Sequence, residues 1–296
     1  MTFKSDLTSF AAKLETVLDN VLPQPIGHQA IVAEAMRYAA MGGGKRLRPY
    51  LMIETARLFR ADDAKVWPGL WNAAAALECL HVYSLVHDDL PCMDDDDMRR
   101  GKATVHKMYN DAIAVLAGDG LLTLSFELMS TASDDAAVAL SMVRELARAG
   151  GVNGMIGGQV IDMTVNEYAR DEALITELQN LKTGALIEFA CHCGAVLAGA
   201  SDDDTLRLRR YARDIGLAFQ IKDDILDVEG DADIVGKAVG KDSDLGKVTF
   251  VSILGLEGAR NKAAELGERA KSHLASFEKD ADRLCATVDF VLNRTH

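Results

Sequence analysis

The sequence has little of several features that mark particular classes of protein. Basic residues are outnumbered, with 32 Lys and Arg against 45 Asp and Glu among 296 residues, which gives a formal charge of −13. Proteins that bind nucleic acid or anionic membranes present clustered positive charge, so this balance argues against both classes. Apolar residues make up 49% and charged residues 26%, which is typical of a folded globular chain.

A targeting signal and a long uncharged apolar segment are also lacking. The N-terminus has no apolar h-region, so it does not read as a secretory signal. The best membrane candidate, residues 184–200, is interrupted by Glu188 and His192 and predicts a buried core helix. Five cysteines are an odd number for a disulfide framework, and Cys191 and Cys193 are two apart, so on a helix they do not share a face for a metal. We expect reduced thiols in a cytoplasmic protein.

Proline is absent after Pro91. Long proline-free stretches rich in Ala, Leu, Glu and Met favour helix. Residues 135–148 and 204–219 repeat apolar side chains at spacings of three and four, which predicts two amphipathic helices. The sequence shows no alternating β-branched runs, no low-complexity linker and no internal repeat. It therefore predicts one all-α domain over residues 1–296, a bundle of about ten helices.

The acidic residues that are present gather in two segments. Residues 88–97 read DDLPCMDDDD, and residues 220–227 read QIKDDILD. One interpretation is a pair of solvated acidic surfaces. However, each segment follows an apolar helical stretch, and like charges about 4 Å apart repel by several kcal/mol at an effective dielectric near 20. A bound cation would remove that cost, so we favour a metal site.

The second segment has a helical spacing suited to such a cation. At 100° per residue, Gln220, Asp223, Asp224 and Asp227 fall within about 100° of one another. Carboxylate oxygens without His or Cys partners select a hard ion such as Mg²⁺ or Mn²⁺, and Mg²⁺ leaves coordination positions for water and substrate phosphate. Two such clusters predict a site that holds a polyphosphate through bridging metals.

The first segment cannot be helical throughout, because Pro91 does not fit a helix interior. We expect the preceding helix to end near Asp88 and a loop to carry Asp94 back toward it. A rival interpretation takes His87 and Asp88 as a metal phosphohydrolase dyad, but no other histidine forms a second metal motif. His81 lies about 20° from Asp88 on the same helical face, so it either lines the same cleft or packs in the core.

A phosphate site also needs cations and backbone donors. Basic residues occur after the glycine turn at 42–44, after the first aspartate segment, before Gly184 and after the second segment: Lys45, Arg46, Arg48, Arg99, Arg100, Lys182, Lys237, Lys241 and Lys247. Two apparent P-loops, at 230–238 and 240–248, have five residues between their glycines and no Ser or Thr after the lysine, so neither fits the nucleotide-binding motif.

These motifs together resemble the trans short-chain prenyl diphosphate synthases, specifically the bacterial farnesyl diphosphate synthases. The match runs from about residue 28 to residue 260, and several long motifs in one order make it far more specific than a lone DDxxD. It rests on GGGKRLRP at 42–49, HVYSLVHDDLPCMDDDDMRRGKATVH at 81–106, LAGDGL at 116–121, KTG at 182–184, FQIKDDILDVEGD at 219–231, and GKD and GKVT within 240–249. The pattern departs at Ala103, where the family often has proline.

The resemblance implies roles for particular residues. Asp88 and Asp94 would be the principal metal ligands of the first motif, and Asp223, supported by Asp227, would serve the second. The substrate groups would be Arg99, Lys182 and Lys237 on the allylic diphosphate, Lys45, Arg48, His81 and Arg100 on isopentenyl diphosphate, and Thr183 and Gln220 facing the developing allylic cation. It further implies Mg²⁺, in three copies and replaceable by Mn²⁺, a helical bundle around a central cavity, and a homodimer.

The same resemblance implies the reaction. Isopentenyl diphosphate would condense head to tail with dimethylallyl and then geranyl diphosphate to give farnesyl diphosphate (C15), by ionisation, condensation and elimination. In this family a large residue five positions before the first motif forms the floor of the cavity that takes the hydrocarbon tail of the product. Here that residue is Tyr83. A geranylgeranyl (C20) synthase is the nearest alternative. The intact second motif argues against a terpene cyclase, and the basic sets argue against a non-catalytic partner subunit.

Overall fold

A computed structural model describes residues 3–60, 67–164, 171–229 and 248–294. These residues are helical apart from turns, loops and one short antiparallel hairpin, β1 (Met98–Arg99) with β2 (Lys102–Ala103), so the all-α prediction is confirmed. The chain forms two compact units, which we call unit 1 (residues 1–53 and 61–146) and unit 2 (residues 54–60 and 147–296). The single catalytic domain predicted over residues 1–296 stays a prediction.

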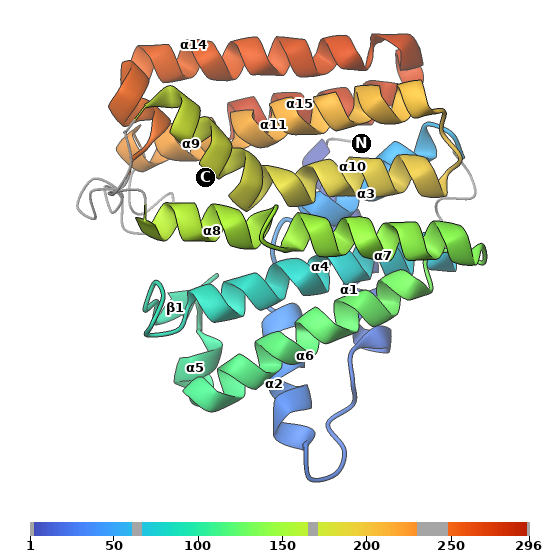
Figure 1. The fold of residues 1–296 in the computed structure, drawn as a ribbon, viewed down its shortest axis with the longest axis vertical. Helices are drawn as coiled ribbons and strands as arrows, with labels where there is room; N and C mark the ends of the chain where they lie inside the picture. Colours follow the sequence, from blue (N-terminus) through green and yellow to red (C-terminus); the bar gives the residue numbers. More distant parts are fainter. Residues whose placement is uncertain (1–2, 61–66, 165–170, 230–247, 295–296) are drawn as a thin grey trace. The chain divides into compact units, whose positions relative to one another are not determined.

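Figure 1 shows the helices of the described residues. In chain order they are α1 (Phe3–Val21), α2 (Ala30–Ala40), α3 (Leu47–Arg57), α4 (Pro68–Asp88), α5 (Val105–Met108), α6 (Asp111–Ser130), α7 (Ala136–Gly150), α8 (Met155–Thr164), α9 (Glu172–Gln179), the π-helical turn η3 (Asn180–Gly184), α10 (Ala185–Leu197), α11 (Asp202–Glu229), α14 (Phe250–His273), the 3-10 turn η4 (Ala275–Ala281) and α15 (Asp282–Asn293). The two segments with helical periodicity fall in α7 and α11, as predicted.

The core of unit 1 is built on α4. Pro68 occupies the first turn, where its missing N–H is not needed, and residues 73–77 are completely buried. The helix packs along α6, and the two lie side by side in Figure 1. Gly118 of α6 faces the ring of His87, and a Cβ atom at position 118 would overlap that ring. This close approach fixes the end of α4 that precedes the first aspartate segment.

The core of unit 2 is built on α10, α11, α14 and α15. Most of α10 is buried, which confirms the core helix predicted within residues 184–200. α11 packs against both α10 and α14, and its Tyr211 hydroxyl donates to the carbonyl of Leu284 at 2.9 Å. The N-terminus of α14 is capped reciprocally by Thr249 and Ser252. The 28-residue α11 therefore holds the second aspartate segment on a packed helix.

Among the described residues, α6 is the helix whose length and composition would suffice to cross a membrane. Core helices of globular proteins meet the same test, and 39% of its apolar window is buried within the fold.

Candidate active site

The loop after α4 returns to the end of the helix, as the sequence predicted. α4 ends at Asp88, and the backbone N–H of Asp94 donates to the carbonyl oxygen of Asp88 at 2.8 Å. The carbonyl of Leu90 accepts from the N–H groups of Met93 at 2.8 Å and Asp95 at 3.1 Å, which closes the turn around Pro91. The backbone thus brings Asp88 and Asp94 together, and their all-oxygen donor set suits a hard divalent cation.

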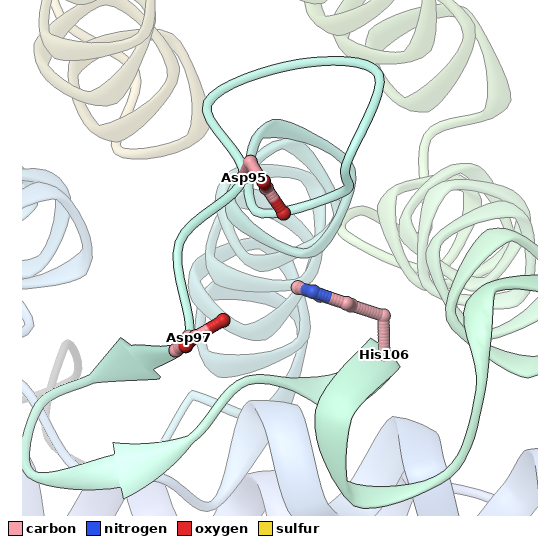
Figure 2. A group of neighbouring side chains, drawn as sticks. All are labelled: Asp95, Asp97 and His106. Carbon is pink, nitrogen blue, oxygen red and sulfur yellow. The ribbon is translucent and has the colours of Figure 1, made fainter.

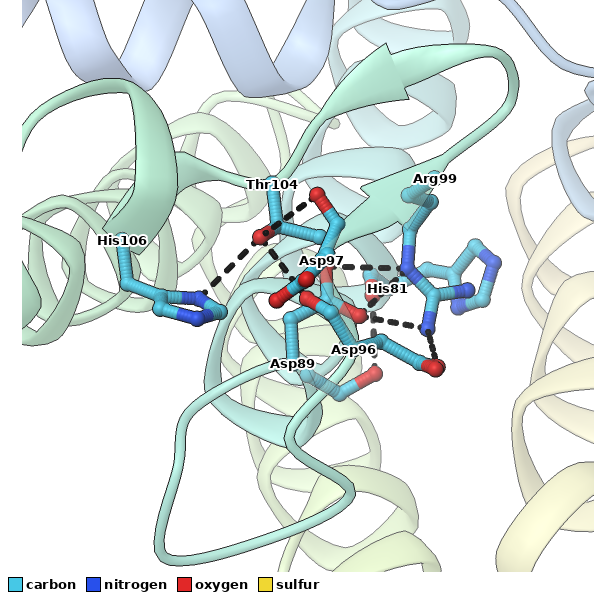
Figure 3. Close-up of polar contacts among 8 residues, drawn as sticks. His81, Asp89, Asp96, Asp97, Arg99, Thr104 and His106 are labelled. Atoms are coloured by element: carbon cyan, nitrogen blue, oxygen red, sulfur yellow. Dashed lines mark hydrogen bonds and ion pairs between the residues drawn. The ribbon is translucent and has the colours of Figure 1, made fainter.

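The neighbouring carboxylate, Asp89, has a different environment. It is 3% exposed, and Arg99 holds it in a two-pronged contact, with Nε at 2.7 and 2.9 Å from its two oxygens and Nη2 at 2.6 Å from Oδ1 (Figure 3). Burial raises the pKa of Asp89 above its ordinary value, and the hydrogen bonds from Arg99 oppose that rise. Sequence reasoning did not assign Asp89 a role. The structure shows that it orients Arg99, the predicted ligand of the allylic diphosphate.

Arg99 and the next predicted diphosphate ligand, Arg100, lie on the β1–β2 hairpin. Its two-residue turn, Arg100–Gly101, has φ values of 53° and 76°, which is the backbone of a type I′ turn. The Arg100 guanidinium donates to the carbonyl oxygen of Gly43. The hairpin therefore directs Arg99 to the end of α4 and Arg100 to the glycine turn at residues 42–44.

The basic residues that follow the glycine turn, at positions 45, 46 and 48, differ in their exposure to solvent. Arg46 is 3% exposed and donates to Glu78 at 2.6 Å and to the carbonyl of Ala40 at 2.6 Å, so it stabilises the core of unit 1. Lys45 is exposed, whereas Arg48 is half-buried and donates from Nη1 to His81 Nε2 at 3.1 Å. Two of the residues predicted to hold isopentenyl diphosphate are thus in direct contact.

His81 is a neutral acceptor in this arrangement. Burial lowers its pKa well below the ordinary value, and the positive charge of Arg48 acts in the same direction. Two residues later on α4, Tyr83 is 5% exposed and makes an edge-to-face contact with His87, with ring centroids 5.6 Å apart. Tyr83 is therefore a packed aromatic residue of α4, and its role in chain length stays a prediction.

Unit 2 holds the other predicted substrate residues. Lys182 and Thr183 lie in η3, a single π-helical turn, and such turns are frequent at functional sites. The Lys182 ammonium lies 2.5 Å from Asp162 Oδ2, and Thr183 is 8% exposed. Gln220 of α11 donates to the side-chain oxygen of Gln179 at 2.8 Å. Sequence reasoning missed Asp162 and Gln179, because their contacts join residues that are 20 and 41 positions apart in the chain.

The second aspartate segment lies on α11, as predicted, but its members differ in exposure. Asp223 is exposed and forms an ion pair with Arg294 at 2.8 Å. Asp224 is 7% exposed and accepts from the backbone N–H of Phe250 at 2.7 Å, at the start of α14. Asp227 is half-buried. Arg294 was missed because it lies far from every motif, and Lys237, Lys241 and Lys247 lie outside the described residues.

A second group of possible metal ligands lies beyond Asp94 in unit 1. One carboxylate oxygen each from Asp95 and Asp97 and one ring nitrogen of His106 lie within 4.8 Å of one another (Figure 2). Sequence reasoning did not assign these three residues a role.

Comparison with known proteins gives a consistent result. The family model described as "Polyprenyl synthetase" matches residues 29–287. The chain is 42% identical over 303 residues to the farnesyl diphosphate synthase of Escherichia coli, covering 99% of both chains. It is 41% identical over 285 residues to an Arabidopsis thaliana heterodimeric geranylgeranyl pyrophosphate synthase large subunit, covering 94% of this chain and 75% of that protein. The crystal structure of an FPP/GFPP synthase from Zymomonas mobilis superimposes with a TM-score of 0.86 at 43% identity, covering 98% of each chain.

Proposed function

The chain belongs to the polyprenyl synthetase family and is a short-chain prenyltransferase, and on this premise we propose that it synthesises farnesyl diphosphate. It condenses isopentenyl diphosphate head to tail with dimethylallyl diphosphate and then with geranyl diphosphate. The observation that carries the proposal is the loop that returns Asp94 to Asp88, directly before the hairpin that bears Arg99 and Arg100. Carboxylates for a metal and cations for a diphosphate thus occur on one short segment.

Members of this family depend on a divalent metal, and the residues present fit Mg²⁺. Asp88 and Asp94 in unit 1, and Asp223 and Asp227 in unit 2, offer only oxygen donors, as Mg²⁺ requires. Bound Mg²⁺, with three ions expected and Mn²⁺ as a substitute, would neutralise the charge that develops on the departing diphosphate. Asp223 forms an ion pair with Arg294 at 2.8 Å, so a positive charge already lies beside this carboxylate.

The chain's own side chains perform the remaining tasks. Arg99, Lys182 and Lys237 bind the allylic diphosphate, and their positive charge favours breaking of the allylic carbon–oxygen bond. Thr183 and Gln220 present oxygen dipoles to the allylic cation. The remaining substrate ligands hold isopentenyl diphosphate so that its double bond attacks that cation: Lys45, Arg48, His81 and Arg100. The departed diphosphate then accepts the proton that is lost as the new double bond forms.

A direct assay tests this proposal. The protein is incubated with Mg²⁺, dimethylallyl diphosphate and isopentenyl diphosphate, and the dephosphorylated products are separated by chromatography. We expect a C15 product and complete loss of turnover with EDTA. A C20 product would instead support the geranylgeranyl alternative, which is favoured by the similarity to the Arabidopsis thaliana large subunit. Absence of any elongated product, or turnover without metal, would contradict the mechanism.

Product length gives a sharper version of this test. Tyr83 is a packed side chain on α4, five residues before Asp88. If it limits the tail of the growing product, Tyr83→Ala should shift the product beyond C15. Tyr109→Ala is a matched removal of a tyrosine from the same unit and should leave the product at C15. Unchanged C15 output from Tyr83→Ala would contradict the role of Tyr83 but not the reaction.

We further propose that the protein acts as a homodimer in the cytoplasm, with no nucleic-acid partner and no membrane-spanning segment. The net charge of −13 and the similarity to bacterial farnesyl diphosphate synthases support this proposal. Light scattering after size-exclusion chromatography would distinguish a dimer from a monomer, and cell fractionation would test the location.

A further inference from the structure

The group formed by Asp95, Asp97 and His106 lies outside the carboxylates assigned to the reaction. The two aspartates belong to the loop after α4 and the histidine to α5, on either side of the β1–β2 hairpin. Figure 2 shows both carboxylates and the imidazole pointing toward a common space. Their nearest ligand atoms lie within 4.8 Å of one another, so modest side-chain movements would let all three contact one ion.

His106 supplies the observation that an acidic cluster alone would not. Its side chain is 6% exposed, and its Nε2 atom is buried without a hydrogen-bond partner among the described residues. A buried polar atom without a partner costs about 1–3 kcal/mol, so native structures seldom retain one without a ligand or water. Asp97 beside it is paired with Lys107, and a carboxylate oxygen accepts hydrogen bonds but offers no hydrogen to a nitrogen lone pair. A metal ion can satisfy both groups.

The hydrogen bonds of Thr104 fix the tautomer of His106. The Thr104 hydroxyl donates to the carbonyl oxygen of Asp96 at 2.8 Å, so its oxygen must accept from His106 Nδ1, which lies 3.1 Å away (Figure 3). The Nδ1 atom therefore carries the proton, and Nε2 presents a lone pair. This is the arrangement of metal-binding histidines, in which the second ring nitrogen donates to a protein oxygen that orients the ring.

Neighbouring groups hold both aspartates in place. The backbone N–H of Asp95 donates to Leu90, which fixes the position of Asp95 in the turn. Asp97 forms an ion pair with Lys107 at 2.8 Å, and this hydrogen bond lowers the pKa of the Asp97 carboxyl below its ordinary value. Lys107 contacts Oδ1 of Asp97, so the other carboxylate oxygen remains to accept a cation.

We propose that Asp95, Asp97 and His106 bind one divalent first-row transition-metal ion at a site separate from the Mg²⁺ ligands Asp88 and Asp94. Imidazole nitrogen with two carboxylate oxygens favours Zn²⁺, Fe²⁺ or Mn²⁺, whereas Mg²⁺ prefers oxygen alone. Three protein ligands leave coordination positions for water. The ion joins the residues on both sides of the hairpin that carries Arg99 and Arg100, so its role is to fix the hairpin and not to take part in bond breaking.

The test measures Zn²⁺ binding to the full chain by isothermal titration calorimetry in excess Mg²⁺, which occupies the all-oxygen sites. The exposed thiol of Cys92 is an alternative Zn²⁺ ligand in the same loop, so every protein carries Cys92→Ser. We expect one tight Zn²⁺ site. His106→Gln and Asp95→Asn should each weaken it at least about tenfold, as loss of metal-site interactions typically does. Asp96→Asn removes the same charge from the same run and should leave binding unchanged.

A second measurement guards against misfolding of the variant at the buried histidine. Asp95 is exposed, so Asp95→Asn should fold normally, and circular dichroism checks both variants. In the parent protein, the ¹⁵N resonance of His106 Nε2 should shift when Zn²⁺ is added and stay fixed when Mg²⁺ is added. Equal Zn²⁺ affinity in parent and Asp95→Asn, or an unmoved His106 resonance at saturating Zn²⁺, would overturn the proposal. Neither readout depends on prenyltransferase activity, so failure of the proposed reaction would be seen separately.

Discussion

Two Asp-Asp pairs, Asp88–Asp89 and Asp223–Asp224, belong to the two aspartate segments. In both pairs the two aspartates have different roles. In each pair the second aspartate is buried, at 3% exposure for Asp89 and 7% for Asp224, and is engaged by another part of its own unit. Asp89 binds the guanidinium of Arg99, and Asp224 accepts from the first N–H of α14. In each pair, therefore, the first aspartate is a predicted metal ligand, and the second forms a hydrogen bond that positions a neighbouring segment.

The pairs differ in where their partners come from. The first pair lies at the end of a helix, and the loop and hairpin that follow it supply both Asp94 and Arg99 within eleven residues of Asp88. The second pair lies inside α11, where the backbone cannot turn, so its partners come from distant segments: Phe250 of α14 and Arg294 after α15. Backbone geometry therefore decides whether an aspartate motif is completed locally or by the tertiary fold.

The largest expected effect separates the two members of the first pair. Asp88→Asn keeps the shape of the side chain but removes a charge that is predicted to bind metal. We expect kcat/KM to fall at least about 100-fold, in the range seen when a group that stabilises transition-state charge is removed. Steady-state assays at several Mg²⁺ concentrations measure this loss.

Asp134→Asn is the matched control for that experiment, because Asp134 is an exposed residue of the same unit outside the predicted site. It should retain the parent activity. Near-normal activity of Asp88→Asn would show that the first member of the pair is not a metal ligand.

A smaller effect is expected at the buried member of the first pair. Asp89→Asn removes the charge that orients Arg99, and a hydrogen bond to a charged group contributes about 1.5–3 kcal/mol. We expect KM for the allylic substrate to rise about tenfold or more, with a smaller change in kcat. Asp96 lies farther from Arg99, at 3.7 Å, so Asp96→Asn should change KM less. Equal effects of the two variants would argue against a specific role for Asp89.

The buried member of the second pair should affect stability and not substrate binding. Asp224→Asn replaces a charged acceptor at the N-terminus of α14 with a neutral one, and we expect a loss of about 1–2 kcal/mol in the free energy of unfolding. Urea unfolding followed by circular dichroism measures it. Asp227→Asn makes the same change one turn later on a half-buried side chain and should alter stability by less than about 0.5 kcal/mol. A larger loss from Asp227→Asn would reverse the assignment.

The smallest expected effect is on the pH dependence of stability, and it arises in only one of the two helices that carry the pairs. The helix α4 contains His81 before its aspartate pair, whereas α11 contains no histidine. The pKa of His81 is lowered in the folded protein, so the unfolded chain takes up a proton first as pH falls below about 6.5. Folding stability is therefore complete above that pH and declines below it, by at most about 1.4 kcal/mol per pH unit.

Unfolding free energies measured from pH 7 to pH 5.5 test this slope. His81→Gln should make the slope shallower, whereas His28→Gln, at an exposed position, should leave it unchanged. An identical slope in His81→Gln would mean that other groups cause the pH dependence.

Local sequence signals were sufficient for much of the fold and part of the site. Apolar periodicity located α7 and α11, and Pro91 located the end of α4 and the return of the loop to Asp88. These features depend on interactions within a few residues, which the sequence displays directly. The partners Asp162, Gln179 and Arg294 could not be found in this way, because each contact joins segments that lie far apart in the chain.

The sequence by itself determined that the protein is all-α, that many of its aspartates are concentrated in two segments, and that it resembles the polyprenyl synthetases. Composition, periodicity and ordered motifs suffice for those conclusions. Only the tertiary structure decided which aspartates are available to a ligand: Asp89 and Asp224 are committed to Arg99 and to the N-terminus of α14. It also placed the ring of His106, whose Nε2 atom has no hydrogen-bond partner among the described residues, beside two carboxylates. The physical reason is that burial and hydrogen bonding depend on neighbours in space, and identical aspartates in one motif acquire different neighbours only when the chain folds.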